Sequence, residues 1–199
     1  MRSPSPGGVG RAWRLALTLF GLATAANAAE VGGIRLDERT SVGTSQLVLN
    51  GAGLRKRAFF RVYVAGLYLS EKKASSQEVL ALGGAKRVSI TLMRDLTARE
   101  LVDALEDGIR DNSSPGERLA VNGRVEQLAA NMLAVRQGRR GDVLTVDWRP
   151  GIGTLVFLNG DVKGTAIPGE DLYQALLRVW LGEHPPSAAL KKALLGQAQ

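Results

Sequence analysis

The sequence of 199 residues contains no cysteine and only one histidine, His184. Without a thiol the chain can form neither a disulfide nor a thiolate nucleophile, and it cannot carry a lipid on an N-terminal cysteine. Transition metals in proteins are held mainly by Cys and His side chains. We therefore expect no metal site, and we interpret His184, within Gly182–Pro186, as a turn residue.

Two common enzyme motifs are also missing. No Gly-x-Ser-x-Gly segment presents a serine nucleophile, and such a serine would depend on His184 as its base. The pairs Gly51 and Gly53, and Gly151 and Gly153, lack the spacing of phosphate-binding loops and are not followed by a helix start. We predict that both pairs form turns between strands, and we expect no cofactor.

The N-terminal region lacks an apolar run of the roughly 20 residues that span a bilayer. Three arginines precede an apolar stretch of about 12 residues, Leu15–Ala26, and the small residues Ala26-Asn27-Ala28 end it, which is the order typical of a cleavable secretory signal. We predict a signal peptide over residues 1–28, one domain over residues 29–199, and no membrane anchor after cleavage.

The excess of positive charge is small once that segment is removed. The chain has 26 basic and 19 acidic residues, and three of the arginines belong to residues 1–28, so the remaining domain carries a net charge of +4. Its basic clusters, Arg55–Arg57 and Arg136–Arg140, are short and separated, whereas nucleic-acid binders concentrate basic residues with interleaved aromatics. We expect no nucleic-acid partner, and we expect the domain in the periplasm.

Apolar residues alternate or run continuously over five segments bounded by turn residues, which is the pattern of strands packed on a core. These segments are Ser45–Leu49, Ala58–Leu69, Arg87–Met93, Asp142–Trp148 and Thr154–Leu158. The first two are separated by Asn50–Gly53, which we interpret as a flexible turn. After the last, Asn159-Gly160 favours the positive φ angles of a type I′ hairpin.

Helical spacing of apolar residues predicts a helix that begins near Thr97. In Thr97-Ala98-Arg99-Glu100 the Thr and Glu side chains form a capping box. Leu101, Leu105 and Ile109 then share one stripe, with Gly108 beside them. We expect this stripe to face the interior of the domain.

Further helices are predicted in the second half of the chain. One should run from about residue 117 or 122 to Gln137, with Gly138 as its exit. Another follows from the spacing of Leu172, Leu176 and Trp180, and Ser187 caps a final short helix. Strands in hairpins with helices between them predict an α+β domain, in which helices cover one face of an antiparallel sheet.

The region around Arg55 is the main candidate for a ligand site. Arg55 follows a glycine-rich segment, and Arg61 and Tyr63 point to one face of the next strand. A guanidinium group and a phenol at the mouth of a pocket suit a carboxylate or a developing oxyanion, because guanidinium donors hold planar anions in a fixed geometry. The same residues also fit a solvated arginine and a core aromatic, so composition alone leaves both interpretations open.

Several segments, taken in order, resemble the chalcone isomerase-like superfamily. Gly51–Arg55 and Arg61–Leu69 resemble its opening strand pair. Four later segments are similar to its bacterial exported branch, and they are Asp95–Thr97, Trp148–Thr154, Val179–Pro185 and Lys191–Gly196. The resemblance runs from about Ile34 to Gly196. It implies an open-faced β-sandwich, in which a large antiparallel sheet is covered by a helical layer with a ligand cleft between them.

The enzymes of this superfamily close the heterocycle of a flavanone by adding a phenolate to an enone, while the protein confines the substrate and stabilises the enolate charge. The resemblance places their Arg at Arg55 and their strand Thr at Tyr63. Their helix Tyr and Asn fall at Leu101 and Gly108, and neither residue can donate a side-chain hydrogen bond. Because one such donor is typically worth about 2.7–4 kcal/mol, we do not expect isomerase activity to be retained.

Non-enzymatic relatives of the same fold bind fatty acids, with an Arg and a Tyr holding the carboxylate. This implies Arg55 and Tyr63 as the binding pair, Leu101, Leu105 and Ile109 along the tail, and a small apolar carboxylate or phenolic compound as the ligand. Two alternatives stay open. One is a slow isomerase-type lyase with Arg55 as its electrophilic group, and the other is a partner-binding envelope protein whose cleft is filled by Tyr63.

Overall fold

A computed structural model of the chain describes residues 28–197, so the predicted signal peptide lies outside the described residues except for Ala28. A seven-stranded antiparallel sheet forms the centre of the domain, in the order β11-β10-β9-β6-β5-β4-β3. Its strands are β3 (Arg39–Val42), β4 (Ser45–Arg57), β5 (Phe60–Leu69), β6 (Lys86–Leu92), β9 (Val143–Arg149), β10 (Gly153–Leu158) and β11 (Asp161–Ile167).

Two small antiparallel sheets and five helices complete the described part of the chain. The small sheets pair β1 (Ala28–Val31) with β2 (Ile34–Asp37), and β7 (Leu96–Thr97) with β8 (Gln137–Gly138). The helices are α1 (Ser76–Ala81), α2 (Ala98–Asp111), α3 (Pro115–Leu133), α4 (Glu170–Leu181) and α5 (Ala188–Leu194). Within residues 28–197, none of these helices has the length and apolar character needed to cross a bilayer.

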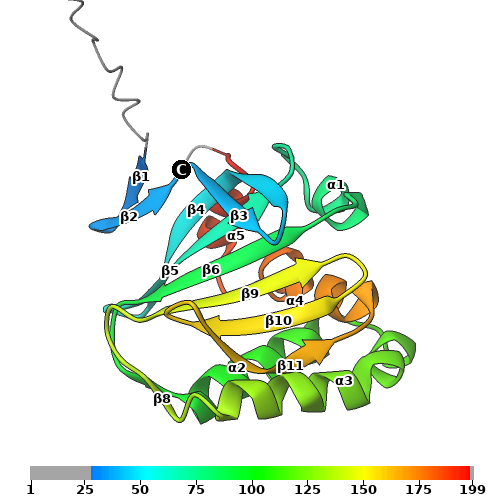
Figure 1. Cartoon of the computed structure of the whole chain (residues 1–199). Coiled ribbons are helices and arrows are strands. Elements are labelled where there is room, and N and C mark those ends of the chain that lie inside the picture. The colour runs from blue at the N-terminus through cyan, green and yellow to red at the C-terminus, as the bar shows by residue number, and fades with distance from the viewer. Residues whose placement is uncertain (1–27, 198–199) are drawn as a thin grey trace, which may run out of the picture.

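The helices gather on the inner face of the curled sheet. Figure 1 shows α2 and α3 along the lower edge of the sheet and α4 and α5 behind it. The larger core lies between sheet and helices and buries, among others, Leu67, Val146, Leu128 and Leu176. This arrangement confirms the predicted α+β class with an antiparallel sheet under a helical layer.

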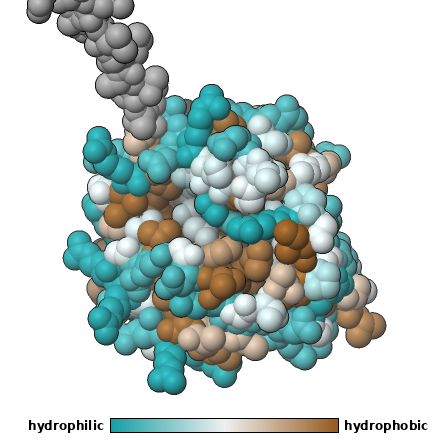
Figure 2. Space-filling model, viewed as in Figure 1, coloured by the Kyte–Doolittle hydropathy of each residue, from teal (hydrophilic) through white to brown (hydrophobic). Residues whose placement is uncertain are grey.

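The outer face of the sheet is covered over only part of its width. The β1–β2 hairpin packs there, and Leu36, Leu47, Val64 and Tyr68 form a second, smaller core. Both faces of β5 are therefore buried along most of its length. Over β9 and β10 none of the helices and strands of residues 28–197 covers the outer face (Figure 1), and Figure 2 shows hydrophobic residues gathered near the middle of that face among hydrophilic ones.

The turn predicted at Asn50–Gly53 is wrong, because these residues lie inside the long strand β4. The chain reverses instead at Ala58 and Phe59, where Ala58 has a φ of 51°. The glycines serve a close approach of helix α5, since a Cβ at Gly51 would lie 2.1 Å from the backbone oxygen of Ala193. Glycine inside a strand often marks such a contact between backbones, and a sequence pattern cannot distinguish it from a turn.

The predicted local signals at Thr97 and at Asn159-Gly160 are confirmed. The Thr97 hydroxyl accepts from the N–H of Glu100, and the Glu100 carboxylate accepts from the N–H of Thr97, so a capping box starts α2. Asn159 and Gly160 have φ angles of 53° and 88°, and they join β10 to β11 in a two-residue hairpin. Both signals depend on contacts between residues only a few positions apart.

The second predicted helix ends earlier than expected. Helix α3 stops at Leu133 rather than Gln137, and Gln137 and Gly138 form strand β8 against β7. A Cβ at Gly138 would lie 2.4 Å from Cδ1 of Leu92, so the glycine allows this short strand to approach β6. The pairing of β8 with β7 ties the end of α3 to the start of α2. It therefore helps to position α2, the helix that lines the cavity described next.

Candidate ligand-binding site

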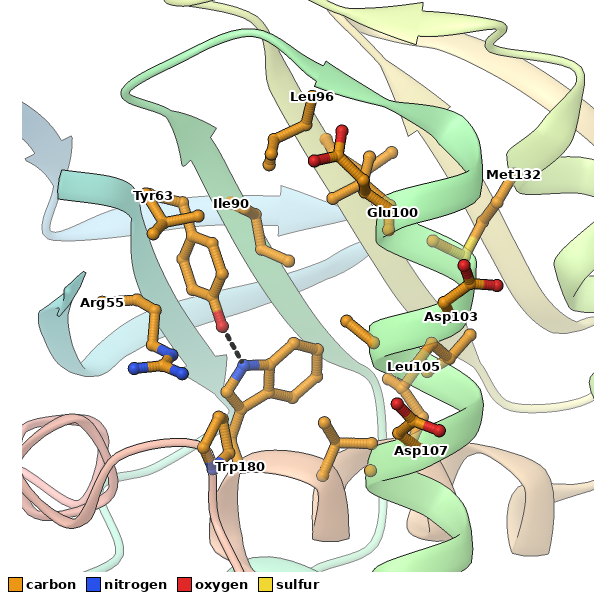
Figure 3. Close-up of a pocket in the computed structure, with 18 of the residues that line it drawn as sticks. Arg55, Tyr63, Ile90, Leu96, Glu100, Asp103, Leu105, Asp107, Met132 and Trp180 are labelled. Atoms are coloured by element: carbon orange, nitrogen blue, oxygen red, sulfur yellow. Dashed lines mark hydrogen bonds between the residues drawn. The ribbon is translucent and has the colours of Figure 1, made fainter. Parts of the chain in front are cut away.

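A cavity of about 500 Å³ lies between the inner face of the sheet and helices α2 and α4. Its interior is mostly hydrocarbon from β6, β9 and the surrounding helices. Among its lining residues are Ile90, Leu105, Met132, Leu144, Val146 and Leu176. Figure 3 shows the side chains of β5 and β6 on one side of this space and those of α2 on the other. The volume falls within the range of about 300–1,000 Å³ typical of small-molecule sites.

Arg55 and Tyr63 are cross-strand partners at one end of this cavity. The two residues are paired in the register of β4 and β5, and both line the cavity. Directly opposed residues of an antiparallel pair project to the same face, with their Cβ atoms about 4.5–5.5 Å apart. A guanidinium group and a phenol therefore share one wall, as Figure 3 shows.

Trp180 of α4 fixes the position of the Tyr63 phenol. The indole N–H of Trp180 donates a hydrogen bond of 2.9 Å to the Tyr63 hydroxyl oxygen. The phenol accepts from Trp180 and makes no other protein hydrogen bond in the described residues, so its own proton is available to a ligand. Burial raises the pKa of Tyr63, and the bond from Trp180 and the nearby charge of Arg55 only partly oppose that rise. Tyr63 is therefore a neutral donor at pH 7.

Arg55 is half-buried at the edge of the cavity rather than enclosed. One guanidinium nitrogen donates to the backbone carbonyl of Lys56. No carboxylate forms an ion pair with Arg55 among residues 28–197. Its remaining N–H groups can thus serve an anion that enters the cavity.

The opposite side of the cavity mouth is acidic. Glu100, Asp103, Asp107 and Asp111 follow one another along α2 and line the cavity. Each of them is paired with an arginine: Glu100 with Arg94, Asp103 with Arg99, and both Asp107 and Asp111 with Arg110. The mouth therefore has an arginine side on the β4–β5 hairpin and a largely compensated carboxylate side on α2.

Two of the three residues predicted for the apolar wall line the cavity, and the third does not. Leu101 and Leu105 face the space, whereas Ile109 is buried in the core outside the cavity lining. The reason is helix geometry, because each residue advances about 100°, so eight residues beyond Leu101 the side chain is rotated by about 80°. Gly108 lies only about 20° from the direction of Leu101 and lines the cavity in place of Ile109.

The two helix positions that the resemblance assigned to catalytic donors both border the cavity. Leu101 has no donor, and Gly108 has no side chain at all. A Cβ at Gly108 would lie 2.6 Å from Cγ1 of Val179, so the glycine allows α2 and α4 to touch. A larger donor side chain at position 108 would collide with Val179.

The part played by Trp180 was not predicted from the sequence. Its spacing with Leu172 and Leu176 indicated only the buried face of a helix, and α4 does bury all three residues. The usable signal was chemical, since a buried indole N–H normally finds an acceptor. Met132 of α3, which the sequence did not single out for the site, is buried in the core and also lines the cavity.

A sequence model of the chalcone isomerase-like family matches residues 28–196. The chain belongs to this family. Among solved structures, a fatty-acid binding protein of Arabidopsis thaliana is similar to this chain, with a TM-score of 0.60 and 15% sequence identity. The alignment covers 82% of this chain and 92% of the plant protein. At that identity the likeness establishes the chalcone isomerase-like fold. No curated protein matches the sequence.

Proposed function

We propose that this chalcone isomerase-like protein is a non-catalytic binder of a small apolar acid, such as a fatty acid. The observation that carries the proposal is the cross-strand pair of Arg55 and Tyr63 at one end of an apolar cavity of about 500 Å³. A carboxylate would accept from the Arg55 guanidinium and the Tyr63 hydroxyl, and the chain would extend along Leu101 and Leu105. The similarity of fold to a plant fatty-acid binding protein supports this ligand class.

The free energies available are sufficient for such a ligand. Burial contributes about 0.8 kcal/mol per methylene, or about 8 kcal/mol for ten methylenes before the cost of ordering the chain. A charge-assisted hydrogen bond from Arg55 adds about 1.5–3 kcal/mol. The hydrocarbon part thus supplies most of the affinity, and the Arg55–Tyr63 pair selects the acid and orients it.

The same geometry does not favour the two alternatives. An isomerase of this family needs donors that would stabilise the enolate, and the corresponding positions hold Leu101 and Gly108. A partner-binding protein with a closed cleft would have Tyr63 filling the pocket, whereas Tyr63 forms part of the wall of an open cavity. We therefore expect added hydroxychalcone to cyclise at the rate seen in buffer alone.

We further propose that the protein belongs to the bacterial exported branch of the family and acts in the periplasm after loss of residues 1–28. The support is the order of basic, apolar and small residues at the N-terminus. The intact mass of protein from a periplasmic extract checks this. A chain beginning at Ala29 is expected, and a chain that retains Met1 would contradict export by this route.

The ligand is tested with the exported protein, which is expected to begin at Ala29. Native mass spectrometry should detect a copurified acyl ligand, and titration calorimetry with a medium-chain fatty acid should detect saturable binding. Arg55→Gln is expected to weaken binding about tenfold to hundredfold, because it removes the charged donor.

Arg61→Gln is the matched control for that experiment. Arg61 lies on the same hairpin, is exposed and does not line the cavity. It should bind the fatty acid with unchanged affinity. If no acyl ligand copurifies and added fatty acid produces no heat and no thermal shift, the binding function is wrong. Equal losses of fatty-acid affinity in the two variants would exclude Arg55 as the hydrogen-bond donor to the ligand's carboxylate.

A further inference from the structure

The tip of the β4–β5 hairpin exposes two adjacent phenylalanines. Phe59 is 99% exposed and Phe60 is 64% exposed, and Phe59 is the most exposed large hydrophobic residue in the described part of the chain. Phe59 lies in the turn beyond the last paired residues, and Phe60 forms the final β4–β5 pair with Arg57 at the end of the sheet. Aromatic side chains normally contribute to a core or an interface, so two of them at a protruding tip indicate contact with something outside the domain.

The same hairpin is strongly basic. Residues 51–70 contain Arg55, Lys56, Arg57 and Arg61 and no acidic residue. Lys56, Arg57 and Arg61 are exposed, and none of these four basic residues forms an ion pair within residues 28–197. The positive charges lie two to four residues from Phe59 along the strands, so they surround the base of the apolar tip. At about 3.3 Å per residue, this places them within about 15 Å of it.

The hairpin also forms one side of the cavity mouth. Arg55 and Arg57 line the cavity, and the acidic residues of α2 form the opposite side. Whatever binds the hairpin tip therefore lies next to the opening.

We propose that the β4–β5 hairpin tip is a docking surface for an anionic lipid bilayer and that it places the cavity mouth at the membrane surface. A bilayer has hydrocarbon beneath negatively charged headgroups, and the hairpin has an apolar tip with positive charges behind it, so the two match layer by layer. Phe59 and Phe60 enter the acyl region while Lys56, Arg57 and Arg61 remain at headgroup level. A protein partner would instead have to offer a hollow for two side chains that protrude from a narrow turn.

The charge distribution around the mouth sets the orientation of this docking. Helix α2 carries five acidic and two basic residues, so an anionic surface repels it. The domain therefore tilts with the hairpin towards the bilayer and α2 away from it. If the proposed function is correct, this contact lets an apolar acid pass between the bilayer and the cavity without crossing water. That last step rests on the proposed function, whereas docking itself does not.

The absence of cysteine allows a direct test with a single introduced thiol. Phe59→Cys, labelled with an environment-sensitive fluorophore, is mixed with vesicles of phosphatidylglycerol and phosphatidylcholine or of phosphatidylcholine alone. Leu119→Cys on α3 is the matched control, because Leu119 is an exposed apolar residue, at 82%, that lies outside the cavity lining. A blue shift is expected for the label at 59 with the anionic vesicles only, and none is expected for the label at 119.

Sedimentation with the same vesicles measures the affinity. Phe59→Ser combined with Phe60→Ser should lower partitioning about tenfold or more, since it removes two apolar side chains from the contact. Lys56→Gln and Arg61→Gln should each lower partitioning to the anionic vesicles by about fivefold. The loss should be smaller at high salt, because salt screens the attraction between these charges and the headgroups. Leu119→Ser should have no effect, and all of these variants should keep their affinity for free fatty acid.

The outcomes separate this proposal from the proposed function. Vesicle binding that depends on Phe59 without any fatty-acid affinity would support docking and contradict the ligand. Fatty-acid affinity without vesicle binding would overturn docking. The hairpin would also cease to be a membrane contact if the label at 59 gave no shift with anionic vesicles or if Leu119→Ser reduced sedimentation equally.

Discussion

The indole N–H of Trp180 donates to the hydroxyl oxygen of Tyr63 across 117 positions of the sequence. This bond fixes the phenol at the wall of the cavity and occupies the oxygen as an acceptor, so the Tyr63 hydroxyl remains free to donate its proton to a ligand. Arg55 lies opposite Tyr63 in the strand register. A donor pair built in this way suits an acceptor-only group such as a carboxylate.

Replacement of Trp180 by Phe should weaken ligand binding and lower stability. It removes the bond to Tyr63, so the phenol is no longer held in one orientation, and unfolding free energy should fall by about 1 kcal/mol for the lost bond alone. Calorimetric titration with a fatty acid and denaturant unfolding measure the two effects. Trp148→Phe is the control, since the buried Trp148 indole N–H has no partner and Trp148 does not line the cavity. Unchanged affinity in Trp180→Phe would show that the bond from Trp180 is not needed to orient Tyr63 towards the ligand.

Gly108→Ala should destabilise the domain by about 1–3 kcal/mol, because the added methyl would overlap Val179 between α2 and α4. Val179→Ala should recover part of that loss. Gly123→Ala in α3 is the matched change, since a Cβ there meets nothing within 4 Å. It should instead stabilise the helix by about 1 kcal/mol. Denaturant unfolding of the three variants decides this, and equal effects at positions 108 and 123 would contradict the steric explanation.

Asp147→Asn should cost about 3 kcal/mol of folding free energy. The Asp147 carboxylate is fully buried and accepts from Arg87 at 2.6 and 2.7 Å, so its loss leaves a partly buried guanidinium without its counter-charge. Asp107→Asn removes an exposed partner of Arg110 on α2 and should leave the melting temperature almost unchanged. Comparable shifts in melting temperature for the two variants would show that burial does not make the Arg87–Asp147 pair more important than an exposed one.

All three tyrosines of the chain should resist ionisation in the folded protein. Burial is the main cause that raises the pKa of Tyr63 and of Tyr173, and it raises that of Tyr68 to about 12. Each folded pKa exceeds the unfolded value of 10.0, so the folded state holds these phenol protons more tightly than the unfolded state. The stability gained by burying the neutral phenols is therefore complete below pH 10 and is lost as the pH rises above it.

A spectrophotometric titration of tyrosinate absorbance measures this effect. The folded protein should show no ionisation step near pH 10, and the unfolded protein should show one of three tyrosines. A normal step in the folded protein would contradict the burial of these phenols.

Several local features were predictable because the contacts that form them are local. The capping box of Thr97 and Glu100 spans three residues, and the Asn159-Gly160 turn spans two. The apolar stripe of Leu172, Leu176 and Trp180 gave the buried face of α4 directly. In contrast, the glycines of β4 were interpreted as a turn, because their purpose is contact with α5, which is more than 130 residues away. Ile109 was placed in the cavity because a stripe of i and i+4 positions ignores the rotation that accumulates along a helix.

The sequence by itself determined the α+β class, the helix caps at Thr97 and Ser187 and the hairpin at Asn159-Gly160, since periodicity and turn chemistry act over a few residues. The resemblance to a family implied Arg55 and Tyr63 as the pair to examine. Only the tertiary structure decided that this pair borders an apolar cavity, that Trp180 restrains the phenol, and that Phe59 stands exposed beside the opening. Those relationships join β4, β5, α2 and α4, and they exist only when the burial of a shared core brings distant segments together.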